Sequence, residues 1–277
     1  RLVLEEHEDL LGRRAPQELE RAALDRGGQP PDDLRRPFAA KTLPARRPMA
    51  RCVVWPPRGW AVVQDRGVRV GTWNLEGRWS QDHLELLVAQ ECDVWLLTEV
   101  RDDTSLPGFG FHLTGARMGQ RKHWAGVFCH GQFRPLPDPH PASAAAEGMG
   151  LVWCSSILPW RCCGTGLWGE GNSSEKTSRV LQQLMVALPV GGLVWGGDWN
   201  HAMQGREYVG SLAGRTAITE ALASRQLQLP TQRLPHALPG LFTIDHIAVP
   251  EGTQIVEATR VVAEGRRGQR LSDHNVY

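Results

Sequence analysis

The chain has 277 residues, of which 41% are hydrophobic and 22% are charged, a composition that can support a sizeable core. Its 31 basic and 30 acidic residues give a net charge of +1, which excludes a strong global basic field. Binding of nucleic acid would therefore need a local basic patch. No apolar run approaches the roughly 20 residues of a membrane-spanning helix, and the first residues are charged rather than signal-like.

The six cysteines favour a reducing, cytoplasmic environment. Four of them lie in or beside apolar runs, where cysteine usually acts as a small buried hydrophobe. The adjacent Cys162 and Cys163 have no second Cys or His pair at zinc spacing. A disulfide framework is therefore not expected, and we expect the chain to be a cytoplasmic monomer.

Residues 1–66 differ in composition from the rest and predict an irregular extension or linker. Leucines and alanines at helical spacing before residue 25 suggest one or two amphipathic helices. Seven prolines between positions 30 and 57 then break regular structure. The arginines in this stretch could contact phosphate, but a solvated linker is the favoured interpretation.

From residue 68 onward, short apolar runs alternate with amphipathic segments. This alternation predicts an α/β domain with stacked sheets over residues 67–277. The expected helices cover residues 82–90, 178–188 and 215–224. The expected strands cover residues 68–73, 94–98, 123–129, 151–158, 193–195 and 242–249, and a further strand begins at residue 276.

Polar side chains occur where four of the apolar runs stop. The segments are Trp-Asn-Leu-Glu at 73–76, Leu-Thr-Glu at 97–99, Gly-Asp-Trp-Asn-His at 197–201 and Leu-Ser-Asp-His at 271–274. A fifth segment, Ile-Asp-His-Ile at 244–247, places an acid inside an apolar run. Buried carboxylates are costly unless they are paired or bound to a cation. Five such segments in one domain therefore suggest that the polar groups converge on one ion.

The residue types favour Mg²⁺ or Mn²⁺ over zinc. Carboxylate and amide oxygens suit Mg²⁺, which leaves positions open for a substrate phosphate. The chain has no His-Glu-x-x-His sequence and no cysteine cluster. A metal held by oxygens would polarise a phosphoryl group, and nearby Asp and His could supply acid–base chemistry.

Each segment also has an ordinary structural explanation. Asn74 could form a turn after a strand, and Glu99 could be an acid in a surface loop. The sequence Gly-Asp-x-Asn is frequent in turns. Asp245 is harder to explain in this way, because a lone buried carboxylate needs partners. The ordered combination of the five segments is what makes the pattern specific.

The order Trp-Asn-Leu, Thr-Glu, Gly-Asp-x-Asn, Ile-Asp-His-Ile and Ser-Asp-His resembles the endonuclease/exonuclease/phosphatase superfamily over about residues 68–277. Members include deoxyribonuclease I-like enzymes, apurinic/apyrimidinic endonucleases, sphingomyelinases and inositol-polyphosphate 5-phosphatases. The resemblance implies an α/β (α+β) fold in which two stacked mixed β-sheets are flanked by helices in a four-layer α/β/β/α sandwich. It also implies metal-dependent hydrolysis of a phosphate ester.

The resemblance implies a metal-binding group. Glu99 would be the principal ligand. Asn74, Glu76 and Asp273 would lie near the ion, directly or through water.

It also implies a catalytic group. Asp198 would orient or deprotonate the attacking water, and Asn200 would hold a phosphate oxygen. His274 would contact the scissile phosphate or serve in acid–base chemistry, with Asp245 as its carboxylate partner. A carboxylate fixes the orientation of an imidazole and stabilises its protonated form.

Two features depart from the family pattern. Many members carry His or Tyr two residues before the proline of the central strand, where this chain has Ile157. Ser156 or a nearby tryptophan could stand in for the missing polar group. The chain also stops within the expected last strand after Ser-Asp-His, so we expect the domain to be truncated there.

Three functions are consistent with these residues. A nuclease would need a basic, aromatic-lined groove, for which we predict Arg121 and Trp124 as substrate-binding residues, with Trp199 and His201 beside the catalytic acid. The same machinery could act on a small phosphate ester or a phospholipid head group, which suits the near-neutral charge. A catalytically silent binding module is the third possibility. The complete set of polar residues disfavours it.

Overall fold

Our computed structural model describes residues 53–54 and 67–277 of the chain. The amphipathic helices and the proline-rich linker expected before residue 67 lie outside the described residues. No helix in the described part is both long enough and apolar enough to cross a membrane.

The first sheet has the strand order β1-β2-β3-β6-β4, and β5 also pairs with β6. Its one parallel pair is β2 with β3, and its other pairs are antiparallel. Backbone hydrogen bonds between Tyr277 and Thr72, of 2.7 and 3.0 Å, add the end of the chain to β2. The strands are β1 (Val53–Val54), β2 (Val68–Asn74), β3 (Val94–Arg101), β4 (Phe109–Leu113), β5 (Arg117–Gly119) and β6 (Lys122–His130).

The second sheet has the strand order β11-β12-β10-β9-β8-β7. Only β9 and β10 run parallel, whereas β10 and β12 run antiparallel. The strands are β7 (Phe133–Pro135), β8 (Ser143–Gly148), β9 (Leu151–Ser156), β10 (Leu193–Asp198), β11 (Leu227–Gln228) and β12 (Asp245–Pro250).

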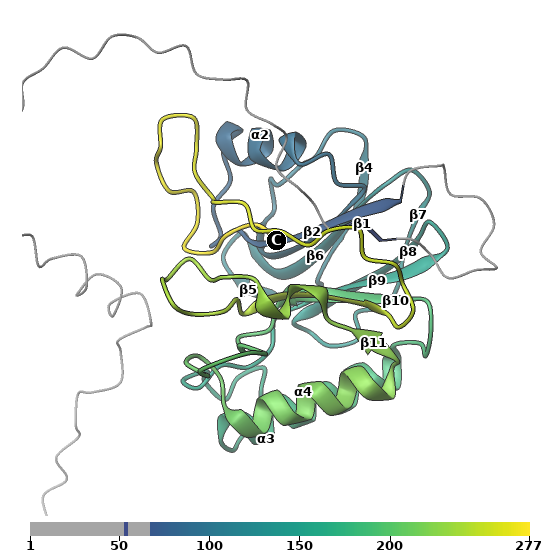
Figure 1. Cartoon of the computed structure of the whole chain (residues 1–277), viewed down its shortest axis with the longest axis vertical. Helices are drawn as coiled ribbons and strands as arrows, with labels where there is room; N and C mark the ends of the chain where they lie inside the picture. Colours follow the sequence, from purple (N-terminus) through teal and green to yellow (C-terminus); the bar gives the residue numbers. More distant parts are fainter. Residues whose placement is uncertain (1–52, 55–66) are drawn as a thin grey trace, which may run out of the picture. The chain divides into compact units, whose positions relative to one another are not determined.

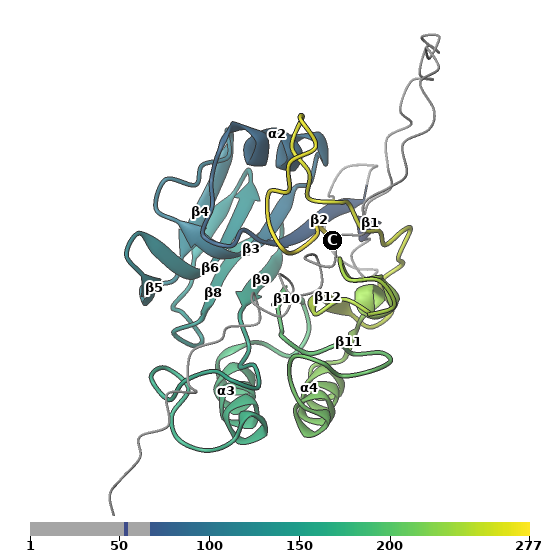
Figure 2. The same cartoon turned by 90° about the vertical axis from the view of Figure 1, so that its left-hand side faces the viewer.

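The helices cover the outer faces of the two sheets (Figures 1 and 2). Helix α2 (Gln81–Ala89) packs Leu87 on the first sheet. Helices α3 (Ser173–Ala187) and α4 (Leu212–Ser224) pack on the second sheet, and a 3-10 turn, η1 (Pro230–Arg233), precedes β12. The expected four-layer α/β/β/α arrangement is therefore confirmed.

A core between the sheets holds the two middle layers together. Leu96 of β3, Val127 of β6, Val194 of β10 and Ile247 of β12 all have no solvent exposure in this layer. Burying one such side chain stabilises the fold by roughly 1.5–3 kcal/mol. Because successive side chains of a strand point to opposite faces of the sheet, one face of each sheet contributes side chains to this shared core.

The three expected helices and six expected strands are present with shifted ends. Helix α3 begins at Ser173, five residues earlier than expected, because Asn172 and Glu175 form a capping box. Strand β8 escaped prediction, because its Ala-Ala-Ala run lacks the β-branched residues typical of strands. It pairs along its whole length with β9, so tertiary pairing decides its conformation.

The two glycines before Asp198 allow the carboxyl end of β10 to approach its neighbours. Gly197 has a φ of +121°, and a Cβ atom there would lie 2.2 Å from the backbone oxygen of Ser156. Only glycine tolerates this conformation and this closeness. The Gly-Gly-Asp sequence therefore positions Asp198 by backbone contact.

We predict that Leu96→Ala lowers the free energy of unfolding by about 2–5 kcal/mol, because it leaves a cavity between the sheets. Leu212→Ala is the matched control. Leu212 is 68% exposed on α4, so this change should stay within about 0.5 kcal/mol. Urea unfolding of both variants measures the difference. Equal losses in the two variants would contradict the assigned core.

Candidate active site

Residues from both sheets meet at one edge, where the parallel strands β2 and β3 end. In the second sheet, Asp198 ends β10 and lies opposite Asp245 of β12 in the antiparallel register. The segment 271–274 then passes beside the end of β2, where Ser272 Oγ donates a hydrogen bond of 2.6 Å to the Asn74 carbonyl oxygen. The strand ends that the sequence predicted are therefore brought together.

Asn74 connects acids from the two sheets. Its amide nitrogen donates to Glu99 Oε1 at 3.2 Å and to Asp198 Oδ2 at 3.0 Å. Its amide oxygen accepts a hydrogen bond of 2.8 Å from the backbone N–H of Glu76. In this structure Asn74 thus orients two carboxylates, and its oxygen is engaged by the neighbouring loop.

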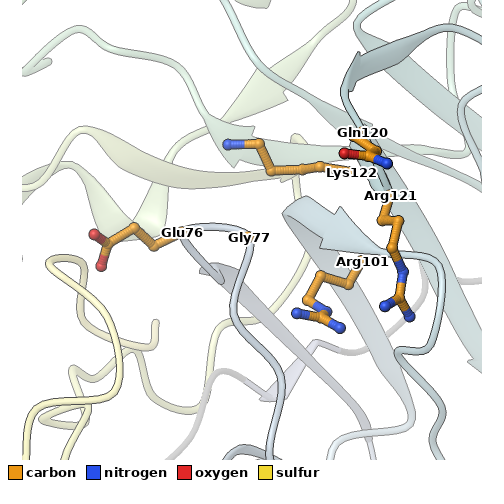
Figure 3. Close-up of a pocket in the computed structure, with 6 residues that line it drawn as sticks. All are labelled: Glu76, Gly77, Arg101, Gln120, Arg121 and Lys122. Carbon is orange, nitrogen blue, oxygen red and sulfur yellow. The ribbon is translucent and has the colours of Figure 1, made fainter.

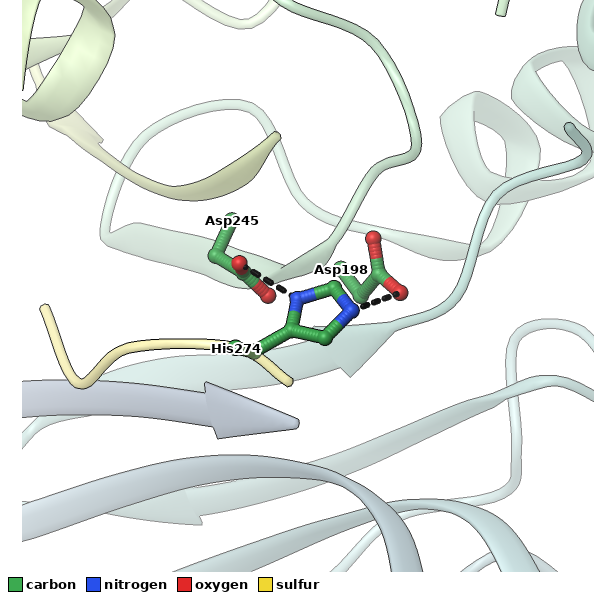
Figure 4. A group of neighbouring side chains, drawn as sticks. All are labelled: Asp198, Asp245 and His274. Carbon is green, nitrogen blue, oxygen red and sulfur yellow. Dashed lines mark hydrogen bonds and ion pairs between the residues drawn. The ribbon is translucent and has the colours of Figure 1, made fainter. Parts of the chain in front are cut away.

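His274 lies between two buried aspartates (Figure 4). Its Nδ1 is 2.7 Å from Asp245 Oδ2, and its Nε2 is 4.0 Å from Asp198 Oδ2. Nε2 is also 3.8 Å from Asp273 Oδ1. Asp245 is completely buried, and its other oxygen has no hydrogen-bond partner among the described residues. Its negative charge is therefore balanced mainly by the imidazole.

These contacts favour a protonated His274. Burial disfavours the imidazolium, but the charges of Asp245 and Asp198 outweigh this penalty and raise the pKa of His274 well above its ordinary value. Burial also raises the pKa of Asp198 to about 7, against the lowering effect of the His274 charge. The arrangement is an imidazolium held by one carboxylate, next to a second carboxylate that exchanges protons near neutral pH.

Three further acids lie beside this group. The backbone N–H of Asp273 donates to Glu76 Oε2 at 3.3 Å. Burial, and then the charge of Asp273, raise the pKa of Glu76, and Glu99 adds to the effect. These carboxylates repel one another, and hard oxygen donors in this number suit a divalent cation. Glu76, Glu99 and Asp273 therefore offer the type of oxygen donor that Mg²⁺ or Mn²⁺ prefers, although their oxygens do not all lie within 4.8 Å of one another in this structure.

Among the described residues, one ligand atom from each of Asp198, Asp245 and His274 lies within 4.8 Å of the others. A protonated imidazole has no lone pair to offer a metal. These three residues therefore fit a proton-holding group better than a metal site.

Asn200 has a constrained position next to Asp198. Its backbone N–H donates to Asp198 Oδ1 at 3.0 Å, and its side-chain nitrogen donates to the Leu158 carbonyl oxygen at 3.0 Å. Its φ of +53° lies in the left-handed region. Glu76 and Glu99 share this conformation, with φ of +55° and +51°. Such backbone strain is commonly stored at functional sites.

The polar group that the family resemblance led us to look for at Ile157 is missing from this site. Ile157 is 1% exposed and packs in the core under the second sheet. Ser156 does not replace it, because its hydroxyl is buried and accepts a hydrogen bond of 2.9 Å from Trp195 Nε1. The possibility that Ser156 stands in is therefore wrong.

The four predicted substrate-binding residues divide into two pairs. Trp199 and His201 have no solvent exposure, and His201 Nδ1 bonds to the Trp199 carbonyl oxygen at 2.8 Å. The prediction that these two side chains contact substrate is wrong, because both belong to the core. Arg121 is 59% exposed beside the site, and Trp124 is half-buried against Trp168.

Two residues outside the predicted metal-binding and catalytic groups also lie near the site. Lys122 opens β6, and its Nζ is 2.8 Å from Glu99 Oε2. The buried His236 has its ring centroid 6.3 Å from that of His274. The other site residues were found as polar side chains at the ends of predicted strands. Neither Lys122 nor His236 follows a predicted strand, so this criterion does not select them.

No protein-family model matches the chain, and no curated protein sequence matches it. Solved structures are similar to it. The endonuclease domain of TRAS1, a telomere-specific non-LTR retrotransposon, is 15% identical, with a TM-score of 0.48 over 76% of this chain and 95% of that chain.

An endonuclease/exonuclease/phosphatase family protein from Leptotrichia buccalis is 11% identical, with a TM-score of 0.49 over 76% and 97% of the two chains. The AP endonuclease LMAP from Leishmania major is 12% identical, with a TM-score of 0.48 over 66% and 79%. Likeness at this level says nothing about activity, so the side chains of the site decide the function proposed below.

We predict that Asp245→Asn lowers the pKa of His274, because the buried ring loses its nearest stabilising charge while the penalty of burial remains. NMR titration of the histidine ring signals measures this pKa. Asp138→Asn is the control, since Asp138 bonds His112 at the same distance of 2.7 Å outside the site. An unchanged His274 titration in Asp245→Asn would contradict the assigned ion pair.

Proposed function

We propose that the chain is a divalent-metal-dependent phosphoesterase and that its substrate is a phosphodiester of nucleic acid. The observation that carries this proposal is the His274–Asp245 ion pair, which lies beside Asp198 and faces the separate acids on the first sheet. One side of the site thus holds a proton and a positive charge. The other side holds oxygen ligands for a cation.

The proposed reaction is in-line attack of water on the phosphorus: a new P–O bond forms, the P–O bond to the ester oxygen on the opposite side breaks, and the leaving oxygen takes up a proton from solvent. Asp198 orients this water and accepts its proton, a role that suits a carboxyl group with a pKa near neutrality. His274 places its positive charge against the phosphoryl oxygens, and Asp245 keeps the ring protonated and oriented. Asn200 contributes an amide donor to a phosphate oxygen. Positioning and charge stabilisation supply most of the catalysis in such reactions.

In this proposal Glu99, Glu76 and Asp273 hold Mg²⁺ or Mn²⁺, and Asn74 lies close to the ion while orienting Glu99 and Asp198. When bound, the metal would polarise the phosphoryl group and stabilise the charge that develops on it. Asn74 joins the two halves of the site, because its amide touches an acid of each sheet.

A small phosphate ester is the second candidate substrate, and the net charge of +1 favours it over a polyanion. The exposed cations next to Glu99 favour nucleic acid. Activity assays separate the two candidate substrates. They compare plasmid DNA, single-stranded DNA, RNA and soluble phosphate esters, each with Mg²⁺, with Mn²⁺ and with EDTA. Turnover of an ester without nicking of plasmid would select the small substrate.

We predict that Glu99→Gln lowers the metal-dependent rate at least about 100-fold, because the variant keeps the shape of the side chain but loses the charge that binds the cation. Calorimetric titration with Mg²⁺ or Mn²⁺ should show weaker binding of the metal by the same variant.

Glu147→Gln is the matched control, because Glu147 lies on β8 and pairs with Arg134 outside the site. Its rate should stay within about twofold of the wild type. Retention of full metal-dependent activity in Glu99→Gln would overturn the assignment of this residue.

A further inference from the structure

A cavity of about 360 Å³ adjoins the proposed metal site on the side of β6 (Figure 3). Three of its lining side chains are cationic and only one is acidic. Its walls are formed by Glu76, Gly77, Arg101, Gln120, Arg121 and Lys122. The cavity therefore favours an anion.

Asp103 holds the two guanidinium groups of this cavity without saturating them. It accepts hydrogen bonds of 2.8 Å from Nε and Nη2 of Arg101 and one of 3.3 Å from Nη2 of Arg121. A guanidinium carries five N–H donors, so three of Arg101 and four of Arg121 are not used by Asp103. Two arginines on one carboxylate also leave a net positive charge.

Lys122 connects this cavity with the proposed metal site. Its stem lines the cavity while its ammonium bonds Glu99 Oε2 at 2.8 Å, and Figure 3 shows it extending from the arginines toward Glu76. Gly77 makes room for this stem, since a Cβ atom there would lie 2.5 Å from Lys122 Cδ. An anion in the cavity would thus lie next to the phosphate at the metal site.

Stability alone does not explain this grouping of cations. The side chains of Arg101, Asp103 and Arg121 are 31%, 45% and 59% exposed. Ion pairs this exposed contribute about 0–1 kcal/mol each, and neighbouring like charges reduce that gain. Arg121 also has a φ of +61°, an uncommon conformation that places it in the turn between β5 and β6. Binding of an external anion accounts for the grouping of cations, whereas the conformation of Arg121 is that of a short turn between antiparallel strands.

We propose that Arg101, Gln120, Arg121 and Lys122 form a subsite for a second phosphate of the same substrate. Arginine forks match the geometry of phosphate oxygens, and Gln120 adds a neutral amide donor. This inference rests on the proposed function, because it names the part of the substrate next to the phosphate that is hydrolysed. The second phosphate could belong to a nucleic-acid strand or to a small bisphosphate.

The test compares Arg121→Gln and Arg101→Gln with the wild type on a single-stranded oligonucleotide and on bis(p-nitrophenyl) phosphate, which has one phosphorus. We expect each variant to raise KM for the oligonucleotide about tenfold and to affect the one-phosphate ester at least fivefold less. Fluorescence anisotropy with the oligonucleotide in EDTA should show the same loss of affinity. Arg121→Lys should lose less affinity for the oligonucleotide than Arg121→Gln, because lysine keeps the positive charge.

Arg134→Gln is the matched control, because Arg134 is 68% exposed and pairs with Glu147 on β8. It should change each constant less than twofold. Equal effects of Arg121→Gln on the two substrates, or equal effects of Arg121→Gln and Arg134→Gln on the oligonucleotide, would overturn the subsite. If wild-type protein turns over neither substrate with any metal, the proposed function fails instead.

Competition by a nucleoside 3′,5′-bisphosphate identifies the source of the second phosphate. Inhibition as strong as that by an uncleaved oligonucleotide, and lost in Arg121→Gln, would support the subsite with a small bisphosphate. Weaker inhibition, with the oligonucleotide effect retained, would support the subsite with a nucleic-acid strand. Inhibition by the bisphosphate that is unchanged in Arg121→Gln would count against the subsite.

Discussion

Repulsion between carboxylates at one edge of the two sheets is the constraint on which the rest of the site depends. Burial makes each of these charges more costly, and the structure offers only local compensation. His274 balances the acids of the second sheet, while Lys122 pairs with Glu99 and Arg78 pairs with Glu76. The remaining negative charge is what a divalent cation would neutralise. The acids concerned are Glu76, Glu99, Asp198, Asp245 and Asp273.

The main parts of the site could be predicted from sequence because strand ends are visible in it. Apolar runs give the strands, and strands that stack in two sheets bring their polar ends to a common edge. Asp198 and Asp245 illustrate this, since the register of β10 and β12 sets them opposite each other. The identity of the residues at each end then carried the family resemblance, which supplied a role for each of them.

The rest depends on geometry that sequence patterns do not encode. Trp199 and His201 adjoin the proposed catalytic acid, yet both side chains are buried in the core on either side of the turn at Asn200, which has a φ of +53°. Lys122 reaches Glu99 only because β6 lies beside β3 in the sheet. The pairing of β6 with β3, which cannot be read from the order of residues, also brings the cationic side chains of the cavity together. Strand β8 was missed for a related reason: its alanine-rich sequence favours a helix, but its pairing with β9 makes it a strand.

The segment that carries His274 has a consequence for how the protein folds. Trp73 Nε1 donates a hydrogen bond to the His274 carbonyl oxygen across 201 positions of sequence. Contacts of such long range slow folding, because a large loop must close before the contact can form. During synthesis, β2 and β3 emerge long before this segment does. The edge of β2 at Thr72 therefore stays unpaired while the ribosome makes the second sheet, and the proposed active site is completed only after His274 has been made.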